Sequence, residues 1–318
     1  MKKIGIITSG GDAPGMNPAI RAAVRTCLNN GVEPYVIYDG YKGLVEGRII
    51  KADRRFVSEV LNRGGTIIGT ARLKEFTELS VQEKGYNNLK KIGIEGLVIV
   101  GGDGSFRGAK ELSEFGIKCI GVAGTIDNDI NADGYTVGFD TALNTIVEAV
   151  DKIRDTSSSH HRCSIVEVMG RHCGDLALYS SIACGADILI TEETGYDLEF
   201  MYKDIIRMKE EGRKHVLIII SENILDCHEL AKKIEDNTGL ETRANILGHF
   251  QRGGTPTAMD RFRASVLASE AVKYLLAGKN KEMLYLENKE VKSISLDEAI
   301  KKKKVAYSYL YDVNKIIG

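Results

Sequence analysis

Residues 96–105 read GLVIVGGDGS, an apolar run that ends in three glycines, one carboxylate and one hydroxyl. A second run of this kind, residues 119–129, reads CIGVAGTIDND. If both runs are strands, their polar residues follow the carboxyl ends of neighbouring strands, where open α/β sheets bind ligands. The first cluster offers backbone N–H groups for phosphate oxygens and a carboxylate for a metal. The second offers a hydroxyl and two carboxylates, so together they suit transfer of a phosphoryl group to an alcohol.

The bulk composition is that of an ordinary globular protein. The 318 residues are 43% hydrophobic and 27% charged, with a formal net charge of -1, which gives no sign of a nucleic-acid or membrane partner. No apolar run reaches the roughly 18 residues of a membrane span, and the first residues, MKKIGIIT, are too short for a signal peptide. Six cysteines without C-x-x-C spacing indicate reduced thiols, so we expect a cytoplasmic protein.

Strand-like runs alternate with helix-length segments, which predicts an α/β fold of two Rossmann-like lobes, each a mainly parallel sheet flanked by helices, with a site in the cleft between them. We expect strands at 4–8, 35–38, 97–100, 120–122, 164–168, 188–190 and 216–220, and helices at 17–28, 109–115 and 141–154. The predicted lobes are 1–139 and 140–254, with 255–305 returning to the first lobe and a helix at 306–318.

A glycine loop, Ser9–Asn17, follows the first predicted strand. Its glycines let backbone amides approach an anion, and we expect Asn17 to cap the next helix, whose N-terminus would face that anion. The loops of P-loop and dinucleotide-binding proteins are absent from the sequence, since Gly278-Lys279 is followed by Asn280 and the glycine pattern from Gly102 has Arg107 in sixth place. The histidines and cysteines lack the spacing of a zinc site.

Two further clusters place arginines beside glycines. Residues 168–172, VMGRH, leave a predicted strand, and residues 247–254, LGHFQRGG, follow Arg243. The planar guanidinium group of arginine binds two phosphate oxygens at once, so these clusters indicate further phosphate sites.

Together these motifs resemble those of the bacterial ATP-dependent 6-phosphofructokinases. The resemblance covers essentially the whole chain and rests on residues 8–17, 62–66, 101–105, 124–129, 168–171, 241–243 and 247–254. It implies Mg²⁺-dependent transfer of the ATP γ-phosphoryl group to fructose 6-phosphate, with 1–139 as the ATP-binding lobe and 140–254 as the sugar-phosphate lobe.

The resemblance also implies roles for individual residues. Asp127 would be the base, with Asp129 beside it to orient it, Asp103 would bind the metal, and Thr125, Arg72 and Arg171 would stabilise the transferring group. The expected ATP-binding residues are Gly11, Tyr41, Arg72, Leu73, Gly102, Asp103, Gly104, Ser105 and Gly108. The expected sugar-phosphate residues are Thr125, Ile126, Asp127, Arg162, Met169, Gly170, Arg171, Glu222, Arg243, His249, Phe250, Gln251 and Arg252.

Family members are regulated tetramers, and the resemblance implies both properties here. The equivalents of Arg162 and Arg243 come from a neighbouring subunit, and ADP activates while phosphoenolpyruvate inhibits at a site between subunits. The residues that match this effector site are Arg21, Arg25, Arg54, Arg55, Ser58, Glu59, Arg154, Gly185, Asp187, Glu211, Arg213, Lys214 and His215. Asp187 stands where a glutamate is usual and Glu211 where a basic residue is common, and both changes predict weaker regulation.

Three alternatives compete with this interpretation. Family members that use pyrophosphate usually carry Asp in place of Gly104 and Lys in place of Gly124, so the two glycines favour ATP. An NAD or lipid kinase would share the Gly-Gly-Asp-Gly loop but not residues 125–129 or the arginine clusters. A non-catalytic nucleotide sensor would need neither Asp127 nor Arg72.

Overall fold

The computed structural model describes residues 1–132, 134–301 and 308–318. The chain forms two compact units. The first holds Met1–Thr141 and the described residues from Arg252 to Lys301, and the second holds Ala142–Gln251 and the last helix. The chain therefore crosses from one unit to the other after Thr141 and returns at Arg252.

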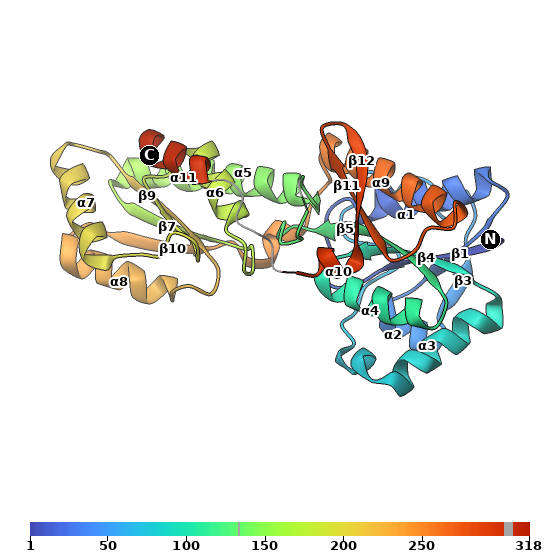
Figure 1. The fold of residues 1–318 in the computed structure, drawn as a ribbon. Helices are drawn as coiled ribbons and strands as arrows, with labels where there is room; N and C mark the ends of the chain where they lie inside the picture. The colour runs from blue at the N-terminus through green and yellow to red at the C-terminus, as the bar shows by residue number, and fades with distance from the viewer. Residues whose placement is uncertain (133, 302–307) are drawn as a thin grey trace. The chain divides into compact units, whose positions relative to one another are not determined.

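The first unit is built on a mainly parallel sheet (Figure 1). Its strands are β1 Lys3–Thr8, β2 Glu33–Ile37, β3 Ile49–Lys51, β4 Gly96–Gly101, β5 Lys118–Thr125, β6 Val137–Gly138, β11 Glu282–Glu287 and β12 Glu290–Ser295. They pair in the order β12-β11-β5-β4-β1-β2-β3, with β6 beside β5. Only the two outermost pairs, β11 with β12 and β2 with β3, are antiparallel among the described strands of this sheet.

Helices cover both faces of this sheet, with α1 and α9 on one side and α2, α3 and α4 on the other (Figure 1). The helical elements are α1 Met16–Asn29, α2 Gly40–Glu46, η1 Lys74–Thr77, α3 Leu79–Ile92, α4 Asp103–Glu114, α9 Ala258–Leu276 and α10 Leu296–Ala299. Leu44, Leu89 and Phe106 meet Ile7 and Ile99 in the buried core under the second group of helices. Central strands buried on both faces explain why β1, β4 and β5 are nearly continuous apolar runs.

The second unit has a smaller sheet, in which every described pair is parallel. Its strands are β7 Cys163–Val168, β8 Ile188–Ile190, β9 Val216–Ser221 and β10 Thr242–Ile246, in the order β10-β7-β9-β8. Its helical elements are α5 Phe139–His160, whose first turn belongs to the other unit, α6 Asp175–Cys184, α7 Leu198–Glu210, α8 Cys227–Thr238, η2 Gly248–Arg252 and α11 Ser308–Ile317. Ile165, Ile218 and Ile220 pack with residues of α7 and α8 in its core.

The predicted α/β class with mainly parallel sheets is confirmed, and each predicted strand overlaps an observed one. One helix extends beyond its prediction and one cap prediction was wrong. The helix predicted at 109–115 is confirmed but begins earlier, at Asp103, so residues 103–105 form the first turn of α4. Asn17 does not cap α1: Gly15 occupies the N-cap position, and Asn17 lies inside the first turn.

No helix of the described residues is long and apolar enough to cross a membrane. All six cysteines are buried as free thiols.

Candidate functional site

Three loops meet at one edge of the first sheet because they follow adjacent parallel strands. β5, β4 and β1 are neighbours, with Gly101 opposite Ala123 and Thr8 opposite Val100. The loops after these strands are therefore the Asp127 loop, the first turn of α4 and the Ser9–Gly15 loop. The predicted meeting of the first two clusters at neighbouring strand ends is confirmed.

The Asp127 loop is fixed by short-range hydrogen bonds. The Asp127 amide donates to Oγ1 of Thr125 at 3.2 Å, and that hydroxyl lies 3.3 Å from the Asp127 carboxylate. Behind the loop, Oγ1 of Thr136 donates to the Thr125 carbonyl at 2.6 Å, while the Thr136 amide donates to Oδ1 of Asn128 at 3.0 Å. Asp127 and Thr125 are buried, which gives the carboxylate one defined position at the strand end.

The residues on either side of Asp127 differ in what they expose. The side chain of Ile126 is fully buried, so only its main chain can face a substrate. Asp129 is partly buried and follows Asn128, whose φ of 52° turns the chain sharply after Asp127.

Arg252 reaches Asp127 from the far end of the sequence. Its Nη2 lies 3.9 Å from Oδ1 of Asp127, and its Nη1 donates to the Asp12 carbonyl at 3.2 Å. A Cβ at Gly11 would come within 2.5 Å of this guanidinium group, so the glycine is needed for the approach. The structure thus places Arg252, expected among the sugar-phosphate residues, beside the predicted base and the first glycine loop.

The first turn of α4 supplies the second part of the site. Asp103 is its first residue, Gly102 is the N-cap, and the N-terminus of a helix favours phosphate oxygens. Gly101 allows the close approach of Ser9 and Ser105, because a Cβ there would lie 2.5 Å from the Ser9 carbonyl. A Cβ at Gly104 would meet no atom within 4 Å, so open space lies in front of this turn.

Tyr41 packs against the same turn. Its hydroxyl donates to the Ser105 carbonyl at 2.5 Å, and its ring stacks on Phe76 with centroids 4.3 Å apart. A Cβ at Gly108 would lie 2.6 Å from the Tyr41 ring, so Gly108 makes room for it. Burial raises the pKa of Tyr41 well above its usual value. Leu73 packs on the edge of the same core.

The loop that carries Arg72 is tied to β1 and α1. Asn17 is fully buried, donates to the carbonyls of Arg63 and Gly64 at 2.9 and 3.1 Å, and accepts from the Ile67 amide at 2.7 Å. Thr70 donates to the Gly10 carbonyl at 2.8 Å. Asn17 therefore anchors this loop rather than capping its own helix, and Arg72 emerges exposed at the end of the anchored stretch.

In the second unit, Met169, Gly170 and Arg171 follow the carboxyl end of β7. Gly170 has φ of 140° and Arg171 has φ of 58°, a turn that leaves the arginine side chain exposed. Glu222, at the end of the neighbouring β9, accepts from the Arg171 amide at 2.9 Å.

The segment after β10 joins this cluster through Gln251. The side chain of Gln251 is fully buried, accepts from the Met169 amide at 3.1 Å and donates to the Gly248 carbonyl at 3.0 Å. Gln251 therefore holds the segment after β10 in place through its buried side chain, whereas the side chains of His249 and Phe250 are exposed. Phe250 has 67% of its surface accessible, which is unusual for a phenylalanine.

Arg162 and Arg243 lie at the opposite end of the four-stranded sheet from Arg171 and Glu222. Arg162 directly precedes β7 and Arg243 is the second residue of β10, so both lie at amino ends of parallel strands. β7 has six residues, which at about 3.3 Å per residue separates its two ends by roughly 20 Å. One chain therefore does not bring Arg162 and Arg243 together with Arg171 and Glu222.

The expected effector residues fall into two groups, one in each unit. In the first unit, Arg21 and Arg25 lie one turn apart on α1, and burial together with Arg25 lowers the pKa of Arg21. The remaining members of this group, Arg54, Arg55, Ser58 and Glu59, lie in an exposed loop whose turn is closed by Asp53, which accepts from the amides at 55 and 56.

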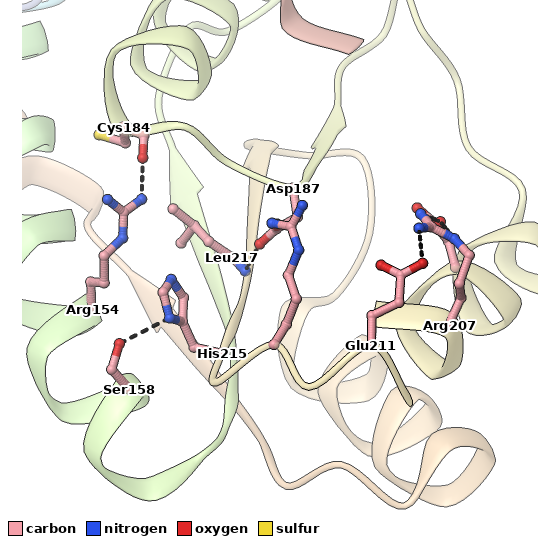
Figure 2. Close-up of polar contacts among 10 residues, drawn as sticks. Arg154, Ser158, Cys184, Asp187, Arg207, Glu211, His215 and Leu217 are labelled. Atoms are coloured by element: carbon pink, nitrogen blue, oxygen red, sulfur yellow. Dashed lines mark hydrogen bonds and ion pairs between the residues drawn. The ribbon is translucent and has the colours of Figure 1, made fainter. Parts of the chain in front are cut away.

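The second group converges at the ends of β9 and α6 (Figure 2). Asp187 bonds to the Arg213 guanidinium group and accepts from the Leu217 amide at 2.8 Å, so both carboxylate oxygens have protein partners. Only 3% of the Asp187 side chain is accessible. Arg154 donates to the Cys184 carbonyl just before Gly185.

Two other members of this group are also paired (Figure 2). Glu211 accepts from Nη1 of Arg207 at 2.9 Å, so its charge is partly neutralised by a residue one turn earlier in the chain. Ser158 and His215 share a hydrogen bond of 2.9 Å. Burial and the nearby Arg154 lower the pKa of His215, and Lys214 is exposed.

Metal binding would have to rely on few protein ligands. Within the described parts of the chain, no group of three or more His, Cys, Asp or Glu side chains is placed to hold an ion. Mg²⁺ at phosphoryl-transfer sites needs only one or two carboxylates besides the phosphates, and Asp103 fits that requirement.

Sequence reasoning missed two residues that organise the site. They are Thr136, behind the Asp127 loop, and Glu241, which pairs with both Arg162 and Arg243. Thr136 bonds to a main-chain carbonyl 11 residues away and Arg162 is far from Glu241 in sequence, so no local pattern signals either role. Gln251 was expected among the sugar-phosphate residues, but its buried side chain bonds to main-chain atoms of its own unit.

The comparisons with known proteins identify the family of the chain. The phosphofructokinase family model matches residues 3–275. A Vibrio vulnificus protein named ATP-dependent 6-phosphofructokinase is 58% identical over 278 residues, 87% of this chain and 87% of that protein. A Vibrio cholerae protein of the same name is 53% identical over 304 residues, 96% of this chain and 95% of that protein.

Solved structures show the same fold. A phosphofructokinase structure from Saccharomyces cerevisiae superposes with a TM-score of 0.88 at 35% identity, over 94% of this chain and 45% of the yeast chain. A pyrophosphate-dependent phosphofructokinase from Marinobacter aquaeolei gives 0.87 at 20% identity, over 97% and 86% of the two chains, which is a likeness of fold alone. With the family model matching from β1 into α9, and relatives more than half identical, this chain belongs to the phosphofructokinase family.

Proposed function

We propose that this protein transfers the γ-phosphoryl group of ATP to the C1 hydroxyl of fructose 6-phosphate, giving fructose 1,6-bisphosphate and ADP, the committed step of glycolysis. The observation that carries the proposal is the pairing of β4 with β5. It sets the buried Asp127 carboxylate beside a helix N-terminus that begins with Asp103. A base next to a phosphate site is what phosphoryl transfer to an alcohol requires.

Asp127 is the proposed base. The C1 oxygen attacks the γ-phosphorus, the bond from that phosphorus to the β-γ bridging oxygen breaks, and the hydroxyl proton passes to the Asp127 carboxylate. Thr125 and Thr136 keep the carboxylate in place, and the guanidinium group of Arg252 lies 3.9 Å from it. Asp129 is the proposed orienting neighbour.

Asp103 is the proposed ligand of Mg²⁺, supported by its position at the first turn of α4 and by the open space beside Gly104. The ion, when bound with the nucleotide, supplies positive charge to the β- and γ-phosphates. Arg72, on its anchored loop, and Arg171, at the β7 turn, are the proposed stabilisers of negative charge in the transition state.

The two glycines at 104 and 124 support ATP as donor. A Cβ at Gly104 would meet no atom within 4 Å, so this side of the turn is open to the approach of a nucleotide phosphate. A Cβ at Gly124 would lie 2.8 Å from the Val100 side chain, so glycine there also serves the packing of the strand end. The choice between ATP and pyrophosphate as donor is tested by the coupled assay described below.

The sugar phosphate is proposed to bind at the carboxyl ends of β7, β9 and β10, through Met169, Glu222 and His249. Arg162 and Arg243 would complete the clamp from a neighbouring subunit. This part of the proposal is supported by their position at the opposite end of the same sheet. It requires an oligomer, and we propose a homotetramer in the cytoplasm.

Regulation by ADP and phosphoenolpyruvate is the last part of the proposal. The two groups of basic residues fit an anionic effector bound between subunits. Because Asp187 is already held by Arg213 and the Leu217 amide, we expect it to bind an effector's metal weakly.

A coupled assay for fructose 1,6-bisphosphate tests the proposal. It would supply fructose 6-phosphate and Mg²⁺ with ATP or pyrophosphate, each with and without ADP and phosphoenolpyruvate. Turnover with ATP alone as donor is the expected result, with modest responses to both effectors. Turnover with pyrophosphate only would overturn the donor assignment, and no turnover with either donor would overturn the function.

A further inference from the structure

Glu241 lies between two arginines at the amino end of the four-stranded sheet. Its Oε2 is 2.7 Å from Nε of Arg162, and its Oε1 accepts a hydrogen bond from Nη2 of Arg243. Arg162 directly precedes β7 and Arg243 lies in the adjacent β10, so a single carboxylate contacts two guanidinium groups that are far apart in sequence.

Hydrogen bonds fix the main chain at this corner, but they do not order the side chains of the two arginines. Cys163 donates its amide to the Glu241 carbonyl at 2.9 Å, and the Arg162 amide donates to Ser157 at 3.0 Å. The Arg243 side chain is 58% accessible and that of Arg162 is 27% accessible. A free arginine side chain loses rotamer entropy when a ligand orders it, and Glu241 removes part of that loss beforehand.

The net charge at this corner favours the binding of an anion. The two guanidinium groups, Arg162 first, lower the pKa of Glu241, so its carboxylate is ionised at neutral pH. Two cations with one anion leave a net positive charge, and His160 lies close enough to act on Glu241 as well. Each guanidinium group has five N–H donors and gives few of them to Glu241, so donors remain for phosphate oxygens.

We infer that Glu241 is a positioning residue that presents Arg162 and Arg243 as one preformed pair to the phosphate group of the sugar. The inference rests on the proposed function of these arginines as part of the clamp. A carboxylate that merely competes with phosphate would instead weaken binding, and its removal would strengthen it. The sign of the change therefore decides the matter.

The test is the kinetics of Glu241→Gln in the full-length protein. We expect the KM for fructose 6-phosphate to rise about tenfold through lost preorganisation, while kcat and the KM for ATP change less than about twofold. Glu241→Asp keeps the charge on a shorter side chain and should give a smaller rise. Glu229→Gln, an exposed glutamate of α8 in the same unit, is the matched control and should leave all three constants unchanged.

An unchanged or lower KM for the sugar phosphate in Glu241→Gln would overturn the inference, and so would a fall in kcat alone. Calorimetric binding of fructose 6-phosphate without nucleotide separates the two claims. If the wild-type protein binds the sugar phosphate but shows no turnover, the proposed function fails, and the affinities of wild type and Glu241→Gln still decide the role of Glu241. If the wild type neither binds nor turns over the sugar phosphate, both fail.

Discussion

At the scale of single residues, the site depends on a few side chains whose surroundings leave them little freedom. Asp127 is buried at the end of β5 and held by its neighbour Thr125. Gly104 is the opposite case, since nothing fills the space where its side chain would be. Substitution of Asp127 therefore tests the proposed base, and substitution of Gly104 tests the identity of the phosphoryl donor.

Asp127→Asn removes the proposed base while keeping the shape of the side chain. Turnover should fall roughly 10²–10⁴-fold, the usual contribution of a positioned base. Because the proposed ATP contacts lie on α4 and the Arg72 loop, ATP affinity should stay near that of the wild type in calorimetry. Turnover close to that of the wild type would show that another group accepts the proton.

Gly104→Asp adds a carboxylate at the first turn of α4, where a Cβ would meet no atom within 4 Å. The added charge should repel the nucleotide phosphates and raise the KM for ATP at least tenfold, with the thermal unfolding temperature unchanged. Gly104→Ala adds volume without charge and should have a smaller effect on the same measurement. Equal ATP kinetics in the wild type and Gly104→Asp would place the nucleotide elsewhere.

At the scale of elements, the loop of Arg72 depends on α1 rather than on its own sequence. Asn17 makes hydrogen bonds to three backbone groups of residues 63–67 from a fully buried position. The loop has no regular structure of its own between Arg63 and Leu73. The order of this loop is therefore a property of the contact between the two elements.

Asn17→Ala should lower both stability and turnover. It removes the three hydrogen bonds of a fully buried side chain to partly buried backbone groups, which costs about 1–3 kcal/mol, and this should lower the unfolding temperature by several degrees. kcat should fall because Arg72 is no longer held in place. Asn30→Ala, an exposed asparagine at the end of the same helix, serves as the control and should change neither quantity. A stable Asn17→Ala variant with normal kcat would show that the loop is ordered by other contacts.

The sequence predicted the elements that carry strong local signals. The apolar runs at β1, β4, β5, β7 and β9 marked buried parallel strands, and the glycines after them marked the loops of the site. It did not predict β10 or β12, whose residues are more polar because these strands lie at sheet edges, and it did not predict β11, which pairs with β12. It also misassigned Asn17, since an asparagine near a helix start is typical of a cap and its real partners lie about 50 residues away.

At the scale of the whole molecule, the four-stranded sheet separates two sets of sugar-phosphate residues that the proposed function needs together. Arg171 and Glu222 lie at the carboxyl ends of its strands, and Arg162 and Arg243 at the amino ends. A second copy of the chain resolves this conflict if it supplies the missing pair. The active unit would then be the oligomer and not the single chain.

Mixed oligomers test this directly. Arg243→Glu and Asp127→Asn should each be nearly inactive at low fructose 6-phosphate, since one loses a clamp residue and the other the base. When the two variants are dissociated and reassembled together, some sites should combine an intact Asp127 with a neighbour's intact Arg243, and activity should reappear. Activity equal to the sum of the separate variants would mean that each chain completes its own site.

The central claim is that ATP is the phosphoryl donor to the C1 hydroxyl of fructose 6-phosphate. Phosphorus NMR of the wild-type protein with fructose 6-phosphate, Mg²⁺, ATP and pyrophosphate in one tube tests it most directly. We predict growing signals of fructose 1,6-bisphosphate and ADP while the pyrophosphate signal stays constant. Loss of pyrophosphate with ATP unchanged, or a phosphorylated product other than fructose 1,6-bisphosphate, would contradict the account.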